Sequence, residues 1–120
     1  MSTLYFTKSH EWISVEGNTA KIGLSDYAQK QLGDLVFVEL PKAGTALKCG
    51  KPFCNVESIK AVSEIYSPAC GRVTAVNDKL ESNPELINQN AMGAWIAQIE
   101  LEQLADGLMG EAEYAVFLKK

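Results

Sequence analysis

The chain has 120 residues, of which 47% are hydrophobic and 22% are charged, so residues 1–120 can supply the core of one domain. Its net charge is −4, and its one arginine, Arg72, and scattered lysines argue against a nucleic-acid surface. No apolar run approaches the ~18 residues that a membrane span needs, and the start of the chain lacks the features of a signal peptide. We therefore expect a soluble monomer in the bacterial cytoplasm, with a mature form from the mitochondrial matrix as the alternative.

The first half of the chain predicts a hairpin, a helix and a strand, in that order. Residues 11–24 predict the hairpin, because two alternating stretches flank a turn-forming one. Ser25 and Gly33 are typical of the two ends of a helix, which predicts a helix of about two turns between them. Residues 34–40 predict a strand that ends at Pro41, because proline cannot donate to a sheet ladder.

The second half of the chain predicts further strands and a helical end. We expect loops at residues 77–79 and a break at residues 83–84. The elements that we expect are a hairpin over 52–66, strands over 72–76 and 95–100, a helical piece near 102–104 and a helix over 111–118. Strands outnumber helices, so the pattern predicts a small β sandwich or barrel with peripheral helices.

Several large or special residues have a predicted structural role. A glycine at position 71, which ends a strand beside Cys70, is expected to need a positive φ angle. The large apolar side chains that we expect in the core rather than in a site are Trp12, Phe37, Trp95 and Ile96.

Cysteine and histidine are sparse in this chain. Cys49, Cys54 and Cys70 make an odd count without a Cys-x-x-Cys spacing, which favours small, reduced, mostly packed thiols over a zinc site or a disulfide framework. A Cys–His nucleophile pair would have to use the lone His10, which we expect in a strand beside Glu11. We therefore predict no metal ligands and no catalytic residues.

Lys60 is the best candidate for a functional residue. It lies near the middle of the predicted 52–66 hairpin, with Gly50 ten residues before it and Gly71 eleven residues after it. A lysine at such a tip projects into solvent, where a modifying enzyme and several partners could reach it. Most lysines at hairpin tips are only solvated charges, so the neighbouring residues decide whether this one carries a covalently tethered arm.

Those neighbours resemble a known attachment site. The segment Val56-Glu57-Ser58-Ile59-Lys60-Ala61-Val62-Ser63 is similar to the lipoyl-attachment segment of glycine cleavage system H proteins. Biotin carriers usually place methionines on both sides of the lysine, and acyltransferase lipoyl domains usually place an aspartate before it. Further stretches resemble motifs of the H-protein family in family order, so the resemblance covers nearly the whole chain: residues 9–12, 32–41, 66–71, 83–88 and 93–95.

The resemblance implies a fold and a function. The expected fold is mainly β, a lipoyl-type barrel-sandwich hybrid with an inserted short helix and C-terminal helices. The expected function is that of a non-catalytic carrier with lipoate attached covalently to Lys60. The arm would take an aminomethyl group from a pyridoxal-phosphate glycine decarboxylase and deliver it to a folate-dependent aminomethyltransferase. It would then pass electrons to an FAD-dependent dihydrolipoyl dehydrogenase, and lipoyl-attaching enzymes would be further partners.

The resemblance also implies a cradle for the loaded arm. The matching positions are Ser9, Glu11 and Glu64, whose oxygens would accept hydrogen bonds from an ammonium group. Ordinary solvated surface is an equally good interpretation of each. Recognition by the lipoylating enzyme is expected close to the lysine, at Glu57, Ser58, Ile59 and Ala61. Two alternatives remain open for the function: a donor of lipoyl groups to 2-oxo acid dehydrogenases, and an unmodified H-like interaction domain.

Overall fold

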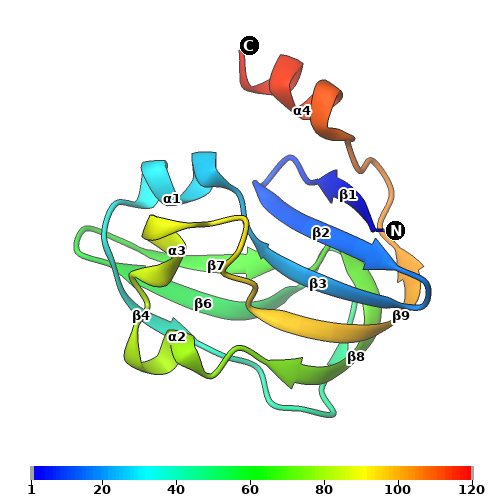
Figure 1. Cartoon of the computed structure of the whole chain (residues 1–120), viewed down its shortest axis with the longest axis horizontal. Helices are drawn as coiled ribbons and strands as arrows, with labels where there is room; N and C mark the ends of the chain where they lie inside the picture. The colour runs from blue at the N-terminus through cyan, green and yellow to red at the C-terminus, as the bar shows by residue number, and fades with distance from the viewer. Residues whose placement is uncertain (1, 120) are drawn as a thin grey trace.

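The computed structural model describes residues 2–119, which form two antiparallel sheets with short helices around them (Figure 1). In spatial order the larger sheet contains β1 (Thr3–Phe6), β2 (Glu11–Glu16), β3 (Thr19–Leu24), β9 (Ala97–Leu104), β8 (Ala69–Val76) and β5 (Ala46–Leu47). The smaller sheet contains β4 (Leu35–Glu39), β6 (Pro52–Ser58) and β7 (Val62–Tyr66). The helices are α1 (Asp26–Leu32), α2 (Lys79–Ser82), α3 (Leu86–Gln89) and α4 (Glu111–Leu118).

The predicted fold class is confirmed, with differences in detail. The fold is mainly β, and α1 is inserted between β3 and β4, as predicted. The two sheets of residues 2–119 remain separate and do not join into a closed barrel. Instead of several C-terminal helices there is one, α4, which lies beyond the edge of the larger sheet and packs against β1 (Figure 1).

The main apolar core lies between the two sheets and beneath two single-turn helices. Leu24 of β3 belongs to the same buried cluster as Val38 of β4 and Val56 of β6. The helices close this cluster with Leu80 of α2 and Ile87 of α3, neither of which has exposed surface. Burying one such side chain stabilises the fold by roughly 1.5–3 kcal/mol, which explains why helices of one turn persist here.

Most of the predicted elements are confirmed. The 11–24 hairpin is formed by β2 and β3, and the 52–66 hairpin by β6 and β7. Helix α1 begins where predicted, because the Ser25 hydroxyl accepts a hydrogen bond from the Ala28 amide at 3.1 Å. It ends at Gly33, whose φ of 82° is unfavourable for a side chain.

Other predictions are wrong because tertiary contacts override local signals. The piece near 102–104 is strand rather than helix, because β9 continues to pair with β8 until Leu104 lies opposite Ala69. The predicted loop at residues 77–79 and break at residues 83–84 are present, except that Lys79 begins α2. The one-turn helices α2 and α3 on either side of the break were not predicted, and their apolar residues complete the core. His10 lies outside β2 with a φ of 72° rather than in a strand. The short strands β1 and β5 were not predicted.

Only some of the four residues predicted for the core are buried. Trp12 and Ile96 are buried as expected, whereas Trp95 is half-buried. The prediction for Phe37 is wrong, because 46% of its surface is exposed. A register shift between Leu35 and Phe37 interrupts the alternation of β4 and leaves two consecutive residues facing outward.

Gly71 is structurally important, but not for the predicted reason. Its φ angle is not among the positive ones, which belong to other glycines. Instead, a Cβ atom at this position would overlap the carbonyl oxygen of Glu100 on β9. The absence of a side chain therefore allows β8 to lie close against β9 at this point.

Replacing Gly71 with alanine should lower the free energy of unfolding by ~1–3 kcal/mol, because the added methyl group forces β8 away from β9. Glu64→Ala is the control, since it truncates an exposed strand residue and should change stability by less than ~0.5 kcal/mol. Urea unfolding of both variants measures the difference. Equal midpoints would show that the close approach at Gly71 makes no contribution.

Candidate functional site

The lysine turn is the end of the β6–β7 hairpin, at residues 59–61. The Ser58 amide donates to the Ala61 carbonyl at 2.8 Å and closes the turn. The largely buried Ser58 hydroxyl oxygen lies within hydrogen-bond distance of the amides of Lys60 (3.3 Å) and Ala61 (3.1 Å). The Ile59 amide donates to the carbonyl of Asp34 at 3.0 Å, which joins the turn to the loop before β4. The backbone of Lys60 is therefore fixed while its side chain is exposed.

The loop between α1 and β4 supports the side chain of Lys60. A Cβ atom on Gly33 would lie 3.4 Å from Lys60 Cε, so the aliphatic stem of the lysine lies beside a residue without a side chain. Asn88 of α3 holds this loop, because its side-chain amide donates to the Gly33 carbonyl and its oxygen accepts from the Leu35 amide, each at 2.9 Å. Neither contact was predicted. The signal for Asn88 in the sequence was its place in the family-like stretch at residues 83–88, which gave no role for its side chain.

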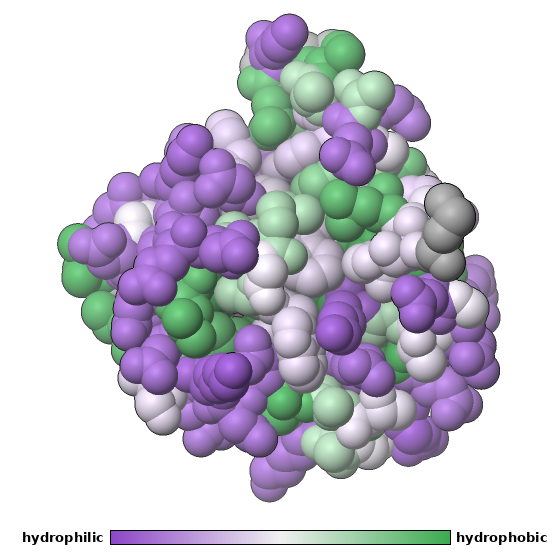
Figure 2. All heavy atoms as spheres, in the orientation of Figure 1, coloured by the Kyte–Doolittle hydropathy of each residue, from purple (hydrophilic) through white to green (hydrophobic). Residues whose placement is uncertain are grey.

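Exposed apolar side chains lie close to Lys60 in the turn and at the start of β7. Ile59 and Val62 each expose 70% of their surface. Phe37, Glu57 and Val62 lie opposite one another across the three strands, so one carboxylate stands between two apolar neighbours. Figure 2 shows hydrophobic atoms at the left edge of the molecule, where the β6–β7 hairpin ends in Figure 1. Lys60 thus lies next to exposed apolar side chains, and exposed apolar surface often marks an interaction site.

A buried carboxylate lies beyond the other end of β7. Glu11, at the start of β2, is only 1% exposed. Its Oε1 accepts hydrogen bonds from the hydroxyl groups of Thr7, at 2.5 Å, and Ser9, at 2.6 Å. Its Oε2 accepts one from the Tyr66 amide at 3.3 Å. All three donors are neutral, and no cation of the described residues lies within ion-pair distance of Glu11.

This carboxylate lines a recess of about 230 Å³. One wall is the loop that carries Thr7 and Ser9, and a second wall contains Gly50 and Tyr66. Residues 105–108 form the remaining side. Two of the three predicted cradle residues, Ser9 and Glu11, therefore come together in one place. Sequence reasoning missed Thr7 and Tyr66, which complete the hydrogen bonds of the carboxylate.

Glu64, the third predicted cradle residue, does not line the recess of Glu11. It lies on the outward face of β7, opposite Asn55 of β6. It lines a separate hollow of about 410 Å³ together with Glu39, Lys48 and Lys51. Glu64 is nevertheless on the same strand as Tyr66, between the lysine turn and the recess.

The contacts of His10 are structural and do not form a candidate site. Its Nδ1 lies 2.7 Å from the hydroxyl of Tyr114, which in turn lies 2.8 Å from the hydroxyl of Ser25. This chain of contacts connects α4 with the start of α1. Burial lowers the pKa of His10, whereas the nearby Glu11 acts in the opposite direction. Residues 2–119 contain no cluster of three or more residues suited to hold a metal ion.

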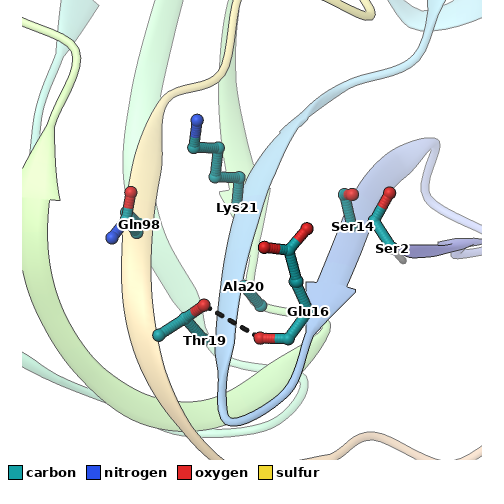
Figure 3. Close-up of a pocket in the computed structure, with 7 residues that line it drawn as sticks. All are labelled: Ser2, Ser14, Glu16, Thr19, Ala20, Lys21 and Gln98. Carbon is teal, nitrogen blue, oxygen red and sulfur yellow. Dashed lines mark hydrogen bonds between the residues drawn. The ribbon is translucent and has the colours of Figure 1, made fainter.

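Another hollow, of about 450 Å³, lies on the larger sheet. Figure 3 shows its polar lining, in which Lys21 of β3 stands near Gln98 of β9 and the Thr19 hydroxyl donates to the Glu16 carbonyl at 3.0 Å. No residue of the β6–β7 hairpin lines it. It is therefore not part of the arrangement around Lys60.

Comparisons with known proteins agree with this arrangement. A family model described as Glycine cleavage H-protein matches residues 4–120. The chain belongs to this family. It is 51% identical, over 97% of its length and 90% of the relative, to a probable glycine cleavage system H protein of Pyrococcus abyssi. It is 52% identical, over 98% and 94%, to the glycine cleavage system H protein of Symbiobacterium thermophilum.

A solved structure from the same family has the same fold as this chain. The crystal structure of a glycine cleavage system H protein from Mycobacterium marinum is 30% identical and has a TM-score of 0.92 over 98% of both chains. Members of the H-protein family are lipoyl carriers of the glycine cleavage system and are not themselves catalytic, and this chain has that role. No helix among residues 2–119 is long and apolar enough to cross a membrane.

Replacing Ser58 with alanine should loosen the lysine turn. The free energy of unfolding should fall by ~1–2 kcal/mol, because two turn amides lose their nearby acceptor. Hydrogen exchange at the amides of Lys60 and Ala61 should become faster by about tenfold. Ser63→Ala is the matched control, since the Ser63 hydroxyl has only a 3.5 Å contact with a neighbouring carbonyl. Unchanged exchange in Ser58→Ala would contradict the proposed hold on the turn.

Proposed function

We propose that Lys60 is the attachment point of the lipoyl group in this carrier. The observation that carries the proposal is an exposed lysine on a hydrogen-bonded turn, in a segment that resembles the lipoyl-attachment segment of the family. Attached to Lys60, the lipoyl group would supply a cyclic disulfide, one sulfur of which can carry the aminomethyl group; both sulfurs would be thiols only after that group has been transferred. The chain supplies the position of the arm, its freedom to move, and a place for its end.

The surroundings of Lys60 fit an acylated lysine. Acylation removes the ammonium charge, and no carboxylate of the described residues lies within ion-pair distance of Lys60 to oppose this. Gly33 leaves room beside the stem of the side chain. The exposed Ile59 and Val62 offer apolar contacts beside the arm.

The lipoyl-lysine arm is long enough to extend along much of β7. From Val62 to Tyr66 the strand advances four residues, or about 13 Å at ~3.3 Å per residue. A lipoyl-lysine arm has roughly ten bonds of ~1.5 Å and, projected along a zigzag, reaches about 12–14 Å. The arm starts at Lys60, two residues before β7, so an arm directed along the strand would extend past Glu64 towards Tyr66 and the recess of Glu11.

We propose that this recess holds the cationic end of the loaded arm. The Glu11 carboxylate and the Ser9 hydroxyl would accept hydrogen bonds from an ammonium group, and the three groups that already donate to Glu11 are neutral. Lys8 and Asp106 also line this recess, one charge of each sign. Enclosure in the recess would exclude part of the water around the carried group. Glu64 lies on the outward face of β7 along the way and would contact the arm before it reaches Glu11.

Membership of the glycine cleavage system implies that this protein has enzyme partners. We propose which enzymes these are, and which residues the lipoyl-attaching enzymes contact. The partners are the pyridoxal-phosphate decarboxylase, the folate-dependent aminomethyltransferase, the FAD-dependent dihydrolipoyl dehydrogenase and the lipoyl-attaching enzymes. The residues proposed for recognition by the last of these are Glu57, Ile59 and Ala61, with Ser58 acting through the shape of the turn. A cytoplasmic location is also proposed, in line with the bacterial and archaeal relatives.

Lys60→Arg should abolish lipoylation without unfolding the domain, because arginine keeps the charge at an exposed position but cannot form the lipoyl amide. The intact mass of protein produced with lipoate and a lipoate-protein ligase measures the modification. Lys51→Arg is the matched control and should be lipoylated normally. A lipoyl adduct on Lys60→Arg would show that the arm is attached elsewhere.

Glu11→Gln should shorten the life of the loaded arm, because it removes the charged acceptor from the recess. Loss of such a contact costs ~1–3 kcal/mol, which corresponds to a roughly five- to hundred-fold faster release of ammonia. Lipoylation itself should be unchanged. Ammonia release over time, from loaded protein without the transferase, measures the effect.

Two variants calibrate this result. Glu64→Gln makes the same chemical change outside the recess and should have a smaller effect, as should Ser9→Ala, which removes a neutral hydroxyl. Intact Tm values would exclude a general loss of structure. Unchanged release from both glutamine variants would mean that neither carboxylate holds the carried group and that other residues form the cradle.

A further inference from the structure

Cys49 and Cys70 bring their thiols into contact, although they lie 21 positions apart in the chain. Their Sγ atoms are 2.7 Å apart, and the Cys49 amide donates a hydrogen bond to Cys70 Sγ at 3.2 Å. A disulfide bond is ~2.05 Å long, so only a small further approach would join the two sulfurs. Both residues are half-buried and therefore partly accessible to a small molecule, whereas Cys54 is buried in the core.

The backbone on both sides holds this pair in place. Cys49 follows β5, which pairs with β8 so that Leu47 lies opposite Gly71. Gly50, with a φ of 76°, turns the chain, and its amide donates to the Ser67 carbonyl at 2.8 Å. On β8, the pairing with β9 shifts register between Cys70 and Gly71. Such an irregularity re-aims side chains, and here the Cys70 thiol meets Cys49.

We propose that Cys49 and Cys70 form a reversible intramolecular disulfide by exchange with a small-molecule disulfide. The thiolate of one cysteine attacks the external disulfide, forms a mixed disulfide and expels one small thiol. The second cysteine then attacks the mixed disulfide, and a second small thiol leaves. The external disulfide is reduced to two thiols, and the protein loses two hydrogen atoms.

The contacts of the two sulfurs indicate which cysteine attacks the external disulfide first. The amide hydrogen bond from Cys49 stabilises negative charge on the Cys70 sulfur. Burial and the neighbouring Cys70 raise the pKa of Cys49 to about 11, which disfavours the thiolate of Cys49. Cys70 is therefore the sulfur that attacks first, and Cys49 resolves the mixed disulfide.

The cross-link would enclose the lysine hairpin. The loop that it closes, residues 49–70, contains all of β6, β7 and the turn at Lys60. It also adjoins the recess, because Gly50 lines the same wall as Tyr66. Closing a loop of this length restricts the unfolded chain, so the oxidised protein should be the more stable form. This inference concerns the cysteines and does not depend on the carrier role of Lys60.

The test uses the full chain without a lipoyl group, equilibrated with oxidised and reduced glutathione. After denaturation, maleimide labelling and intact mass count the free thiols. Wild type should lose two of its three thiols and two hydrogen atoms, with no retained glutathione. Its Tm should rise on the order of 10 °C over that of the reduced protein. Chymotrypsin, which cuts after Phe53 and Tyr66, places the three cysteines on different peptides and identifies the pair.

Variants provide matched controls. Cys54→Ala should form the cross-link as wild type does, whereas Cys49→Ser and Cys70→Ser should each retain two free thiols or carry one glutathione. Retention of all three thiols, glutathione adducts without a cross-link, or a cross-link that includes Cys54 would each overturn the proposal. Peptide mapping of the wild type decides the question even where a variant does not fold. Failure of the Lys60 experiments would leave these outcomes unaffected.

Discussion

The buried carboxylate of Glu11 is the contact on which the recess depends. It extends from the larger sheet and accepts the amide of Tyr66 from the smaller one, so it connects the two sheets directly. It also holds the preceding loop through the hydroxyls of Thr7 and Ser9. A buried carboxylate is costly unless its oxygens are hydrogen-bonded, and these neutral donors meet that need without cancelling its charge. The same arrangement that fixes the fold thus leaves an acceptor for a cation.

The sheet then sets the distance between this acceptor and the lysine. Strand β7 begins next to the turn that carries Lys60 and ends at Tyr66, beside Glu11. Its pairing with β6 fixes its length and direction. Because a paired strand changes length little, Lys60 and the recess of Glu11, which we propose as attachment and holding sites, stay at a constant separation. A carrier that visits several enzymes benefits from this division between a stiff frame and a mobile arm.

The turn itself depends on support from distant parts of the chain. Asn88 of α3 holds the Gly33 loop, and that loop accepts the hydrogen bond from Ile59 through Asp34. Helix α3 exists because Ile87 completes the core between the sheets. The exposed lysine is therefore connected to the apolar core by a continuous series of packed and hydrogen-bonded residues. Its backbone is held firmly, although its side chain is free.

The sequence by itself determined the features that depend on near neighbours. Alternation predicted the hairpins, the caps at Ser25 and Gly33 predicted α1, and the residues around Lys60 indicated the turn. The modification of Lys60 stays a prediction from the resemblance of its segment to the lipoyl-attachment segment. Tertiary structure alone decided the features that join distant residues: the burial of Glu11, the contact of Asn88 with Gly33, and the meeting of Cys49 with Cys70. It also decided that Gly71 is needed for strand approach rather than for its φ angle. Local patterns carry information about backbone conformation over a few residues, whereas these contacts arise only when separate strands pack against one another.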